Sequence, residues 1–407
     1  MNRDKKLYLF YVFFFVIFLG QATYAAFFPV YLSNAGMPSG MLGIINGIYQ
    51  IILFFFVPII GMLSDKIFSA KKVLLGLLVI SSVLLLVFKR VDTIPHLAVT
   101  MVVFSVFFSS MSGIYEALGV NYAMRTGRHY NPIRMAGTIG YAVMSAVLGQ
   151  LLIRQESLMM NSFLLVLLVS FAVCVFLPDI HKVNRKETDG PSQDNNVFML
   201  LKNKELRYVL ALFTVFMLGT SFNSTFFGIH LTHDLEGDYF MVGIGNALLA
   251  VSEFPFHAGP GRRWMKHMGI KRCMIMVMFV GAFRWMIASV CNNPWVFMMT
   301  MVLNGIMLVP VIVELVEYLH AITPEGLKTS AQTVLKAGFS MVGVLLANVV
   351  LGQLVDFLDS RGVEGIRAGY FFLLIVYLTA GVVGISVDKF AVKNRKWRDG
   401  HYVKKTL

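Results

Sequence analysis

Apolar runs of roughly 20 residues recur along the whole chain, and they constrain the fold more than any single motif does. A run of this length crosses the ~30 Å hydrocarbon core of a bilayer as a helix. Lipid offers no hydrogen-bond partners, so each backbone group must be satisfied inside the helix. The composition agrees, because only 14% of the residues are charged, against about 25% in soluble domains. The sequence therefore predicts an all-α membrane protein with twelve transmembrane helices, at about 7–32, 40–63, 72–88, 96–124, 133–154, 160–178, 207–233, 239–260, 271–290, 295–319, 333–357 and 367–387.

The basic residues gather on one side of this predicted topology. With an even number of spans, 29 of the 35 Lys and Arg residues fall in the segments on the side of the N-terminus, and five fall on the other side. Cytoplasmic segments of membrane proteins carry such an excess. We therefore expect a multi-pass protein of the cell membrane with both termini in the cytoplasm and with the first helix retained rather than cleaved as a signal peptide. The net charge of +13 is explained by topology, and no nucleic-acid partner is expected.

The longest polar stretch divides the spans into six and six. It runs from Pro178 to Arg207 and is rich in Gly, Pro, Ser, Asn and charge, a composition typical of a linker. The predicted organisation is an N-terminal six-helix bundle at 1–178, a cytoplasmic linker at 179–206, a C-terminal six-helix bundle at 207–387 and a cytoplasmic tail at 388–407. The loops after the second and eighth spans match at an offset of 200 residues, which suggests a parallel internal repeat of the kind found in transporters.

The loop after the second span carries a recognisable pattern. It reads GMLSDKIFSAKK, from Gly61 to Lys72, and resembles the hallmark loop of the major facilitator superfamily. The resemblance covers the whole chain and implies two pseudo-symmetric bundles. Within that superfamily, the stretch 25–66 and RMAGTIGYAV at Arg134 resemble the lactose-permease group of oligosaccharide–proton symporters. SEFPFHAG at Ser252 and FRWMIASV at Phe283 are more similar to aromatic-acid and nucleoside permeases.

Two opposite charges lie inside neighbouring spans of the first half. Glu116 precedes the break at Gly127 and Pro132, and Arg134 follows it. Antiparallel helices joined at that break place both side chains at a similar depth, because each residue advances a helix by ~1.5 Å. The pair is either a clamp between helices or a polar site, since Arg and carboxylate groups bind hydroxyls by charge-assisted hydrogen bonds. The resemblance to lactose permease implies sugar binding by Glu116 and Arg134, with Tyr141 stacking on the ring. Tyr141 is also consistent with a packing role. Tyr24 and Asn246 are further candidate substrate-binding residues.

Charges in the second half suggest a proton pathway. Glu253 lies inside the eighth span, His257 follows one turn later on the same predicted helix, and Arg284 lies deep in the ninth span. A carboxylate whose cationic neighbour changes with conformation can carry a proton, and a His can join it. A static Glu253–Arg284 bridge is the alternative. The acids and the His that lactose permease uses are absent at the corresponding positions, so Glu253 is the predicted carrier, with Glu314 in reserve.

The loop acid, Asp65, suggests a gate. Asp65 follows Gly61 at a predicted helix end, and Lys66, Lys71 and Lys72 lie close to it in the sequence. An ion pair of this carboxylate can hold the two halves together on the cytoplasmic side in one conformation of the transport cycle. Even a weak exposed ion pair biases a two-state equilibrium. Topology alone accounts for the lysines.

These features predict a proton-coupled symporter that imports a small polyhydroxylated solute, a sugar or oligosaccharide, by alternating access. The alternatives are an uptake permease for nucleosides or aromatic acids, and a proton-antiport exporter of amphiphilic compounds. No enzyme motif is present, so we expect no enzymatic activity, no metal and no cofactor other than the coupling proton. The three cysteines have neither metal-site nor disulfide spacing. We expect a small-molecule substrate, the lipid bilayer and a functional monomer.

Overall fold

The structure is a computed structural model, and it describes residues 3–66, 69–91, 93–179, 197–258, 260–323, 335 and 337–402. Within these residues the chain is helical, and no strand is present. Twelve segments are long and apolar enough to cross a membrane, which confirms the predicted number and the all-α class. Their bounds agree with the predicted runs to within a few residues at most ends.

Proline and glycine residues mark several helix ends in the first half. Pro follows the first residue of both α5 and α6, where its missing N–H costs nothing, and α5 ends at Gly127 in the left-handed conformation. The elements are α1 (Arg3–Ala22), η1 (Thr23–Phe27), α2 (Phe28–Asn34), α3 (Ser39–Lys66), α4 (Ala70–Phe88), α5 (Ile94–Thr126), α6 (Asn131–Leu152) and α7 (Leu158–Phe176).

The second half is more interrupted. Side chains of Asn203, Asp238 and Asn293 accept hydrogen bonds from the first backbone N–H groups of α8, α9 and α12, as N-cap residues do. The elements are η2 (Val197–Lys202), α8 (Lys204–Ile229), η3 (His230–Asp234), α9 (Tyr239–Ser252), α10 (Phe254–Ala258), α11 (Pro260–Val290), α12 (Pro294–Met299), η4 (Thr300–Leu303), α13 (Asn304–Ile322), α15 (Ala337–Leu345), η7 (Leu346–Val350), α16 (Leu351–Asp359) and α17 (Gly365–Tyr402).

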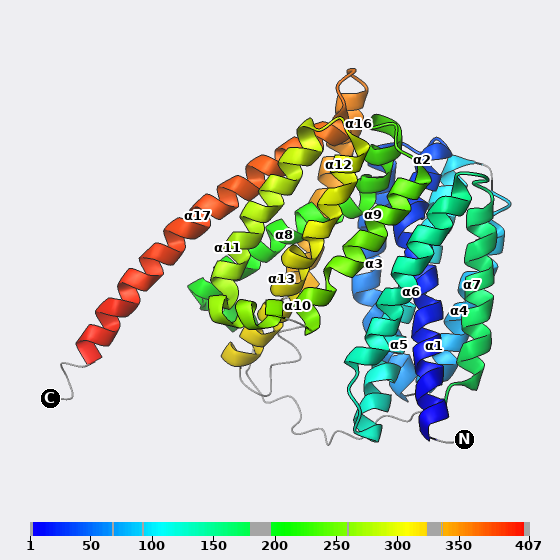
Figure 1. The fold of residues 1–407 in the computed structure, drawn as a ribbon, viewed down its shortest axis with the longest axis horizontal. Helices are drawn as coiled ribbons and strands as arrows, with labels where there is room; N and C mark the ends of the chain where they lie inside the picture. The colour runs from blue at the N-terminus through cyan, green and yellow to red at the C-terminus, as the bar shows by residue number, and fades with distance from the viewer. Residues whose placement is uncertain are drawn as a thin grey trace.

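The helices form two groups (Figure 1). Helices α1 to α7 lie on one side and α8 to α17 on the other, and both termini lie at the same end of the molecule, here called the terminal end. The two groups diverge toward the terminal end and meet toward the opposite end. The meeting surfaces include α6 against α9 and α3 against α16 and η7. Glycines permit this approach, since a Cβ on Gly43 would lie 1.9 Å from the backbone O of Asn348.

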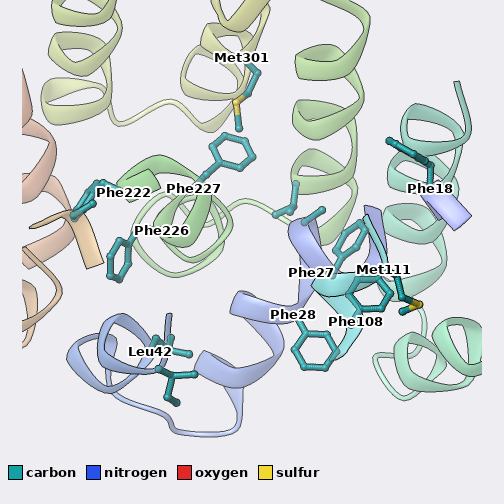
Figure 2. Packing of buried hydrophobic residues seen from close by; sticks show 14 of the residues in the cluster. Phe18, Phe27, Phe28, Leu42, Phe108, Met111, Phe222, Phe226, Phe227 and Met301 are labelled. Atoms are coloured by element: carbon teal, nitrogen blue, oxygen red, sulfur yellow. The ribbon is translucent and has the colours of Figure 1, made fainter. Parts of the chain in front are cut away.

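Aromatic side chains fill the interior of each group. Figure 2 shows Phe27, Phe28 and Phe108 gathered in the first half, and Phe222, Phe226 and Phe227 on α8 in the second. All six are buried. Each such side chain buries a large apolar area, so the two interiors fix the helices that carry the polar residues discussed below.

Three predicted boundaries differ from the structure. The eighth span is not one helix over 239–260, because α9 ends at Ser252 and α10 begins at Phe254; Pro255 has no N–H to continue the ladder. The stretch between the eighth and ninth predicted spans is helical, with a break at Gly269, whose φ of 70° favours glycine. Helix α17 extends past the predicted end of the twelfth span to Tyr402, into the segment predicted as a cytoplasmic tail. Most of the predicted linker, at 180–196, lies outside the described residues, and the division into two bundles stays a prediction.

Candidate functional site

The ion pair predicted from the sequence is present. Arg134 Nε lies 3.6 Å from Glu116 Oε1, and the two side chains are 42% and 46% exposed. The guanidinium also covers the ring of Phe18, with Cζ 4.5 Å from the ring centroid, and Nη1 donates to Thr138 Oγ1 at 3.4 Å. Burial, together with the Glu116 carboxylate, raises the pKa of the neighbouring Tyr130. Because the pair is about half exposed, it has hydrogen-bonding capacity left for a solute.

Glu253 lies on the other half but faces the same region. It is the residue at which α9 gives way to α10, and its Oε1 accepts a hydrogen bond from Asn304 Nδ2 at 3.5 Å. Arg134 acts electrostatically on it across the boundary between the halves. Arg134 is therefore shared, in contact with Glu116 and in electrostatic range of Glu253. The sequence suggested Arg284 as the cation nearest Glu253, whereas the cation that acts on Glu253 electrostatically in the described structure is Arg134.

Arg284 has different surroundings. Its side chain is 1% exposed, Nη2 lies 2.7 Å from Met301 Sδ, and Cζ is 5.0 Å from the ring of Trp285. Within the described part of the chain, Arg284 forms no ion pair and its Nε has no hydrogen-bond partner. The Glu253–Arg284 bridge, the alternative that the sequence left open, is absent among these residues, and Glu253 Oε1 accepts a hydrogen bond from Asn304 Nδ2 instead.

A cavity of about 170 Å³ lies between the halves and beside Arg284. Tyr141 and Asn246, both predicted as substrate-binding residues, line it together, and Tyr141 Oη donates to Asn246 Oδ1 at 3.3 Å. Its remaining polar lining consists of Thr220, Asn223, Ser224 and Asn304. Because Asn304 lines this cavity and donates to Glu253, the cavity and Glu253 are adjacent, and Arg134 lies in electrostatic range of Glu253.

A second cavity of about 210 Å³ adjoins the first, and the two share Ala25, Pro29 and Ser224 in their lining. Tyr24 lines it and donates to Ser105 Oγ at 2.7 Å. A hydrogen bond crosses between the halves here, because Asn46 Nδ2 donates to Thr225 Oγ1. Within the second half, Thr225 Oγ1 donates to Asn348 Oδ1 at 2.7 Å. Tyr24 is therefore separated from Tyr141 and Asn246, and the predicted substrate residues fall into two adjoining cavities.

Wide helical turns shape both cavities. The π-helical segment η1 contains Tyr24 and Ala25, and η7 contains Asn348. A π-turn inserts an extra residue into an α-helix and occurs often at functional sites. These turns interrupt the regular α-helical register at the cavity walls. The sequence contains no pattern that predicted them.

Among the other predicted residues that the structure describes, Glu314, Lys71 and Lys72 are not in the cavity linings. Glu314 on α13 is buried and in electrostatic range of Cys273 on α11. The side chains of His257, Asp65 and Lys66 lie outside the described residues, as do the surroundings of Gly61. Lys71 Nζ donates to the backbone O atoms of Val175 and Leu177 at the end of α7, where a cation stabilises the helix terminus. Lys72 is exposed. The structure thus ties Lys71 to its own half.

A polar cluster that sequence reasoning missed joins the halves at the end opposite the termini. Asn34 and Glu156 belong to the first half, and His233 and Tyr239 to the second. Asn34 Nδ2 donates to Glu156 Oε1 at 3.0 Å and to Tyr239 Oη at 2.9 Å, while His233 Nε2 donates to Asn34 Oδ1 at 2.8 Å. Tyr239 Oη also donates to Glu156. We call these four residues the outer cluster. They are isolated polar residues in loop and helix-end sequence, which gave no signal of their meeting.

The comparisons with known proteins agree with this architecture. The model of the MFS_1 like family matches residues 5–363. The chain is 24% identical to the uncharacterized transporter YwbF of Bacillus subtilis (strain 168) over 391 residues, covering 94% of this chain and 90% of that protein. It is 24% identical to the maltose permease of Geobacillus stearothermophilus over 351 residues, covering 86% and 87%.

The solved structures include a close match in fold. The nucleoside transporter NupG superposes with a TM-score of 0.80 at 16% sequence identity, covering 96% of this chain and all of that one. The family match spans most of the chain, and the relatives are transporters and permeases. The twelve spans form two groups of helices with a polar region between them. The chain is therefore a multi-pass membrane transporter, not an enzyme, and it belongs to the MFS_1 like family of the major facilitator superfamily.

Proposed function

We propose that this transporter is a proton-coupled symporter that imports a small polyhydroxylated solute of the sugar class by alternating access. The observation that carries the proposal is the shared position of Arg134, paired with Glu116 in its own half and in electrostatic range of Glu253 in the other. The name of the maltose permease, one of the relatives, supports the sugar class.

The proposed coupling follows from the cost of charge in a membrane. An ionised carboxylate at membrane depth is costly unless a cation lies beside it, whereas a protonated one needs no cation. When the halves separate at the terminal end, as here, Arg134 is near Glu253 and allows it to be ionised. In the alternate conformation, where Arg134 turns to a bound solute or to Glu116 alone, Glu253 takes up a proton. A conformational change that moves Arg134 thereby moves a proton.

The solute would bind between this charged group and the first cavity. The Glu116–Arg134 pair offers a carboxylate acceptor and a planar set of donors, which together can bind adjacent hydroxyls. Tyr141 and Asn246 would bind the solute from the cavity wall. The second candidate class is the nucleosides, suggested by the printed name of NupG; a nucleoside also presents hydroxyls together with an aromatic base.

The test measures external pH in a lightly buffered suspension of de-energised cells that express the protein. Addition of the transported solute should make the medium alkaline, because each imported solute brings a proton with it. Sugars, nucleosides and aromatic acids are added separately, and cells without the protein serve as the control. Acidification would indicate antiport, and uptake of labelled solute without any pH change would refute proton coupling.

A further inference from the structure

The least expected group in the described structure is the buried guanidinium of Arg284. It lies in the membrane-spanning part of α11 and is 1% exposed. An arginine side chain stays protonated in proteins and carries five N–H donors. The described contacts of this one are the Met301 sulfur, which is a weak acceptor, and the face of Trp285. A thioether and an aromatic face do not neutralise the charge of an arginine inside the membrane. Charged residues inside membrane spans are rare and usually functional.

Two acids of the second half, Asp234 and Glu253, have other partners in the described structure. Asp234 accepts a hydrogen bond from His230 Nδ1 at 2.6 Å, and Glu253 Oε1 accepts one from Asn304 Nδ2 at 3.5 Å. Tyr370 and Tyr377 are the titratable groups that act on Arg284 electrostatically, and neutral phenols supply no negative charge. Within the described residues, the positive charge of Arg284 therefore has no protein counter-ion.

The first cavity provides the space for one. Arg284 forms part of its wall, together with Tyr141 and the amides of Asn223, Asn246 and Asn304. The cavity's volume of about 170 Å³ is many times the ~10–15 Å³ that a single water needs on the same measure, so the cavity can hold a small solute. The described lining contains one cation and no acid, and its hydroxyl and amide groups suit a solute rich in hydroxyls.

We propose that Arg284 binds the carboxylate of the transported solute, so that the substrate is a sugar acid of monosaccharide size rather than a neutral sugar. This inference rests on the proposed function, because it assumes a polyhydroxylated solute in the cavity. A carboxylate accepts two parallel hydrogen bonds from a guanidinium, which supplies the missing counter-ion and a partner for Nε. One anion imported with one proton moves no net charge, so transport should not respond to membrane potential.

The test uses the purified full-length protein and two probes that differ only in charge. Glucuronate carries the carboxylate, and glucuronamide replaces it by a neutral amide of the same shape. Binding is measured by titration calorimetry. Glucuronate should bind about 10- to 100-fold more tightly than glucuronamide, as expected for charge-assisted hydrogen bonds. Equal binding of the two probes by the unaltered protein would overturn the inference, whatever any variant does.

Variants locate the effect. Arg284→Gln should remove the preference for glucuronate, and Arg284→Lys should retain part of it, because Lys keeps the charge but not the planar donors. Arg361→Gln is the matched control, since Arg361 is exposed and lies at a helix end far along the chain from the cavity lining. A preference that survives in a folded Arg284→Gln protein would also overturn the inference.

The outcomes separate this inference from the proposed function. If glucose and glucuronamide bind as tightly as glucuronate, the sugar transporter stands and the role of Arg284 fails. If no hexose or hexuronate binds while nucleosides do, the proposed function fails and the sugar-acid inference fails with it. In proteoliposomes, a potential imposed with valinomycin should leave the rate of glucuronate uptake unchanged.

Discussion

Close packing of α6 against α9 should make the balance between conformations sensitive to a single methyl group. Gly243 lies on α9 where the helices meet, and a Cβ built on it would be 2.1 Å from the backbone O of Ser145 and 3.1 Å from Gly149 Cα. The change we consider is Gly243→Ala. It adds one methyl group to the contact surface of the two halves at the end opposite the termini and leaves the rest of the protein unchanged.

The magnitude follows from the geometry. Carbon and oxygen atoms in close helix contacts are normally ~3.3–3.6 Å apart, so the two helices must separate by about 1 Å to accept the methyl group. Overpacking of this kind costs about 1–3 kcal/mol. The cost applies to the conformation in which α6 and α9 are in contact, and it should shift the equilibrium toward the conformation open at that end by about 5- to 150-fold.

The assay is pulsed electron paramagnetic resonance between two spin labels. Gln155 and Val363 are exposed on opposite halves near that end, and they are labelled after replacement of Cys174, Cys273 and Cys291. Gly243→Ala should enlarge the population with a longer distance between the labels. The matched control is Gly76→Ala, because a Cβ there would meet nothing within 4 Å. An unchanged distance distribution in Gly243→Ala, or an equal shift in Gly76→Ala, would refute the reasoning.

Three further changes test other parts of the structure. Tyr239→Phe removes the hydroxyl that bonds Glu156 and Asn34; loss of about 1 kcal/mol should raise the open population at that end about 5-fold in the same spin-label assay. Arg134→Lys keeps the charge beside Glu116 but loses the planar donors, so substrate binding should weaken at least tenfold while the melting temperature stays within a few degrees. Normal substrate binding by this variant would mean that the Glu116–Arg134 pair only holds the two helices together. Gly269→Ala forces a non-glycine residue to a φ of 70° and should lower stability by ~1 kcal/mol or more, which thermal unfolding in detergent can measure against Gly76→Ala.

Much of the fold could be predicted because the membrane imposes it. The length of each apolar run determines a span, and the break at Gly127 and Pro132 determines how far Glu116 and Arg134 lie from their common turn. That pair was predicted correctly as a contact, since antiparallel neighbours on either side of a tight turn have little freedom of register.

The partners across the two halves could not be predicted in the same way. Arg134 is in electrostatic range of Glu253, and Asn34 donates to Tyr239, because the two halves pack together, as α6 does on α9 at Gly149 and Gly243. The π-turn that contains Tyr24 and the buried position of Arg284 beside Met301 likewise depend on packing. No local pattern of hydrophobicity or charge encodes these contacts, so the sequence could not show which arginine lies in electrostatic range of Glu253.

The most direct test of the account is the behaviour of Glu253→Gln in proteoliposomes. Once the substrate is identified, exchange of labelled for unlabelled solute and accumulation driven by a proton gradient are measured in the same preparation. Gln keeps the hydrogen bond to Asn304 but cannot release a proton, and exchange needs no net proton movement. The account predicts normal exchange and no accumulation above equilibrium. Accumulation equal to that of the unaltered protein would contradict it.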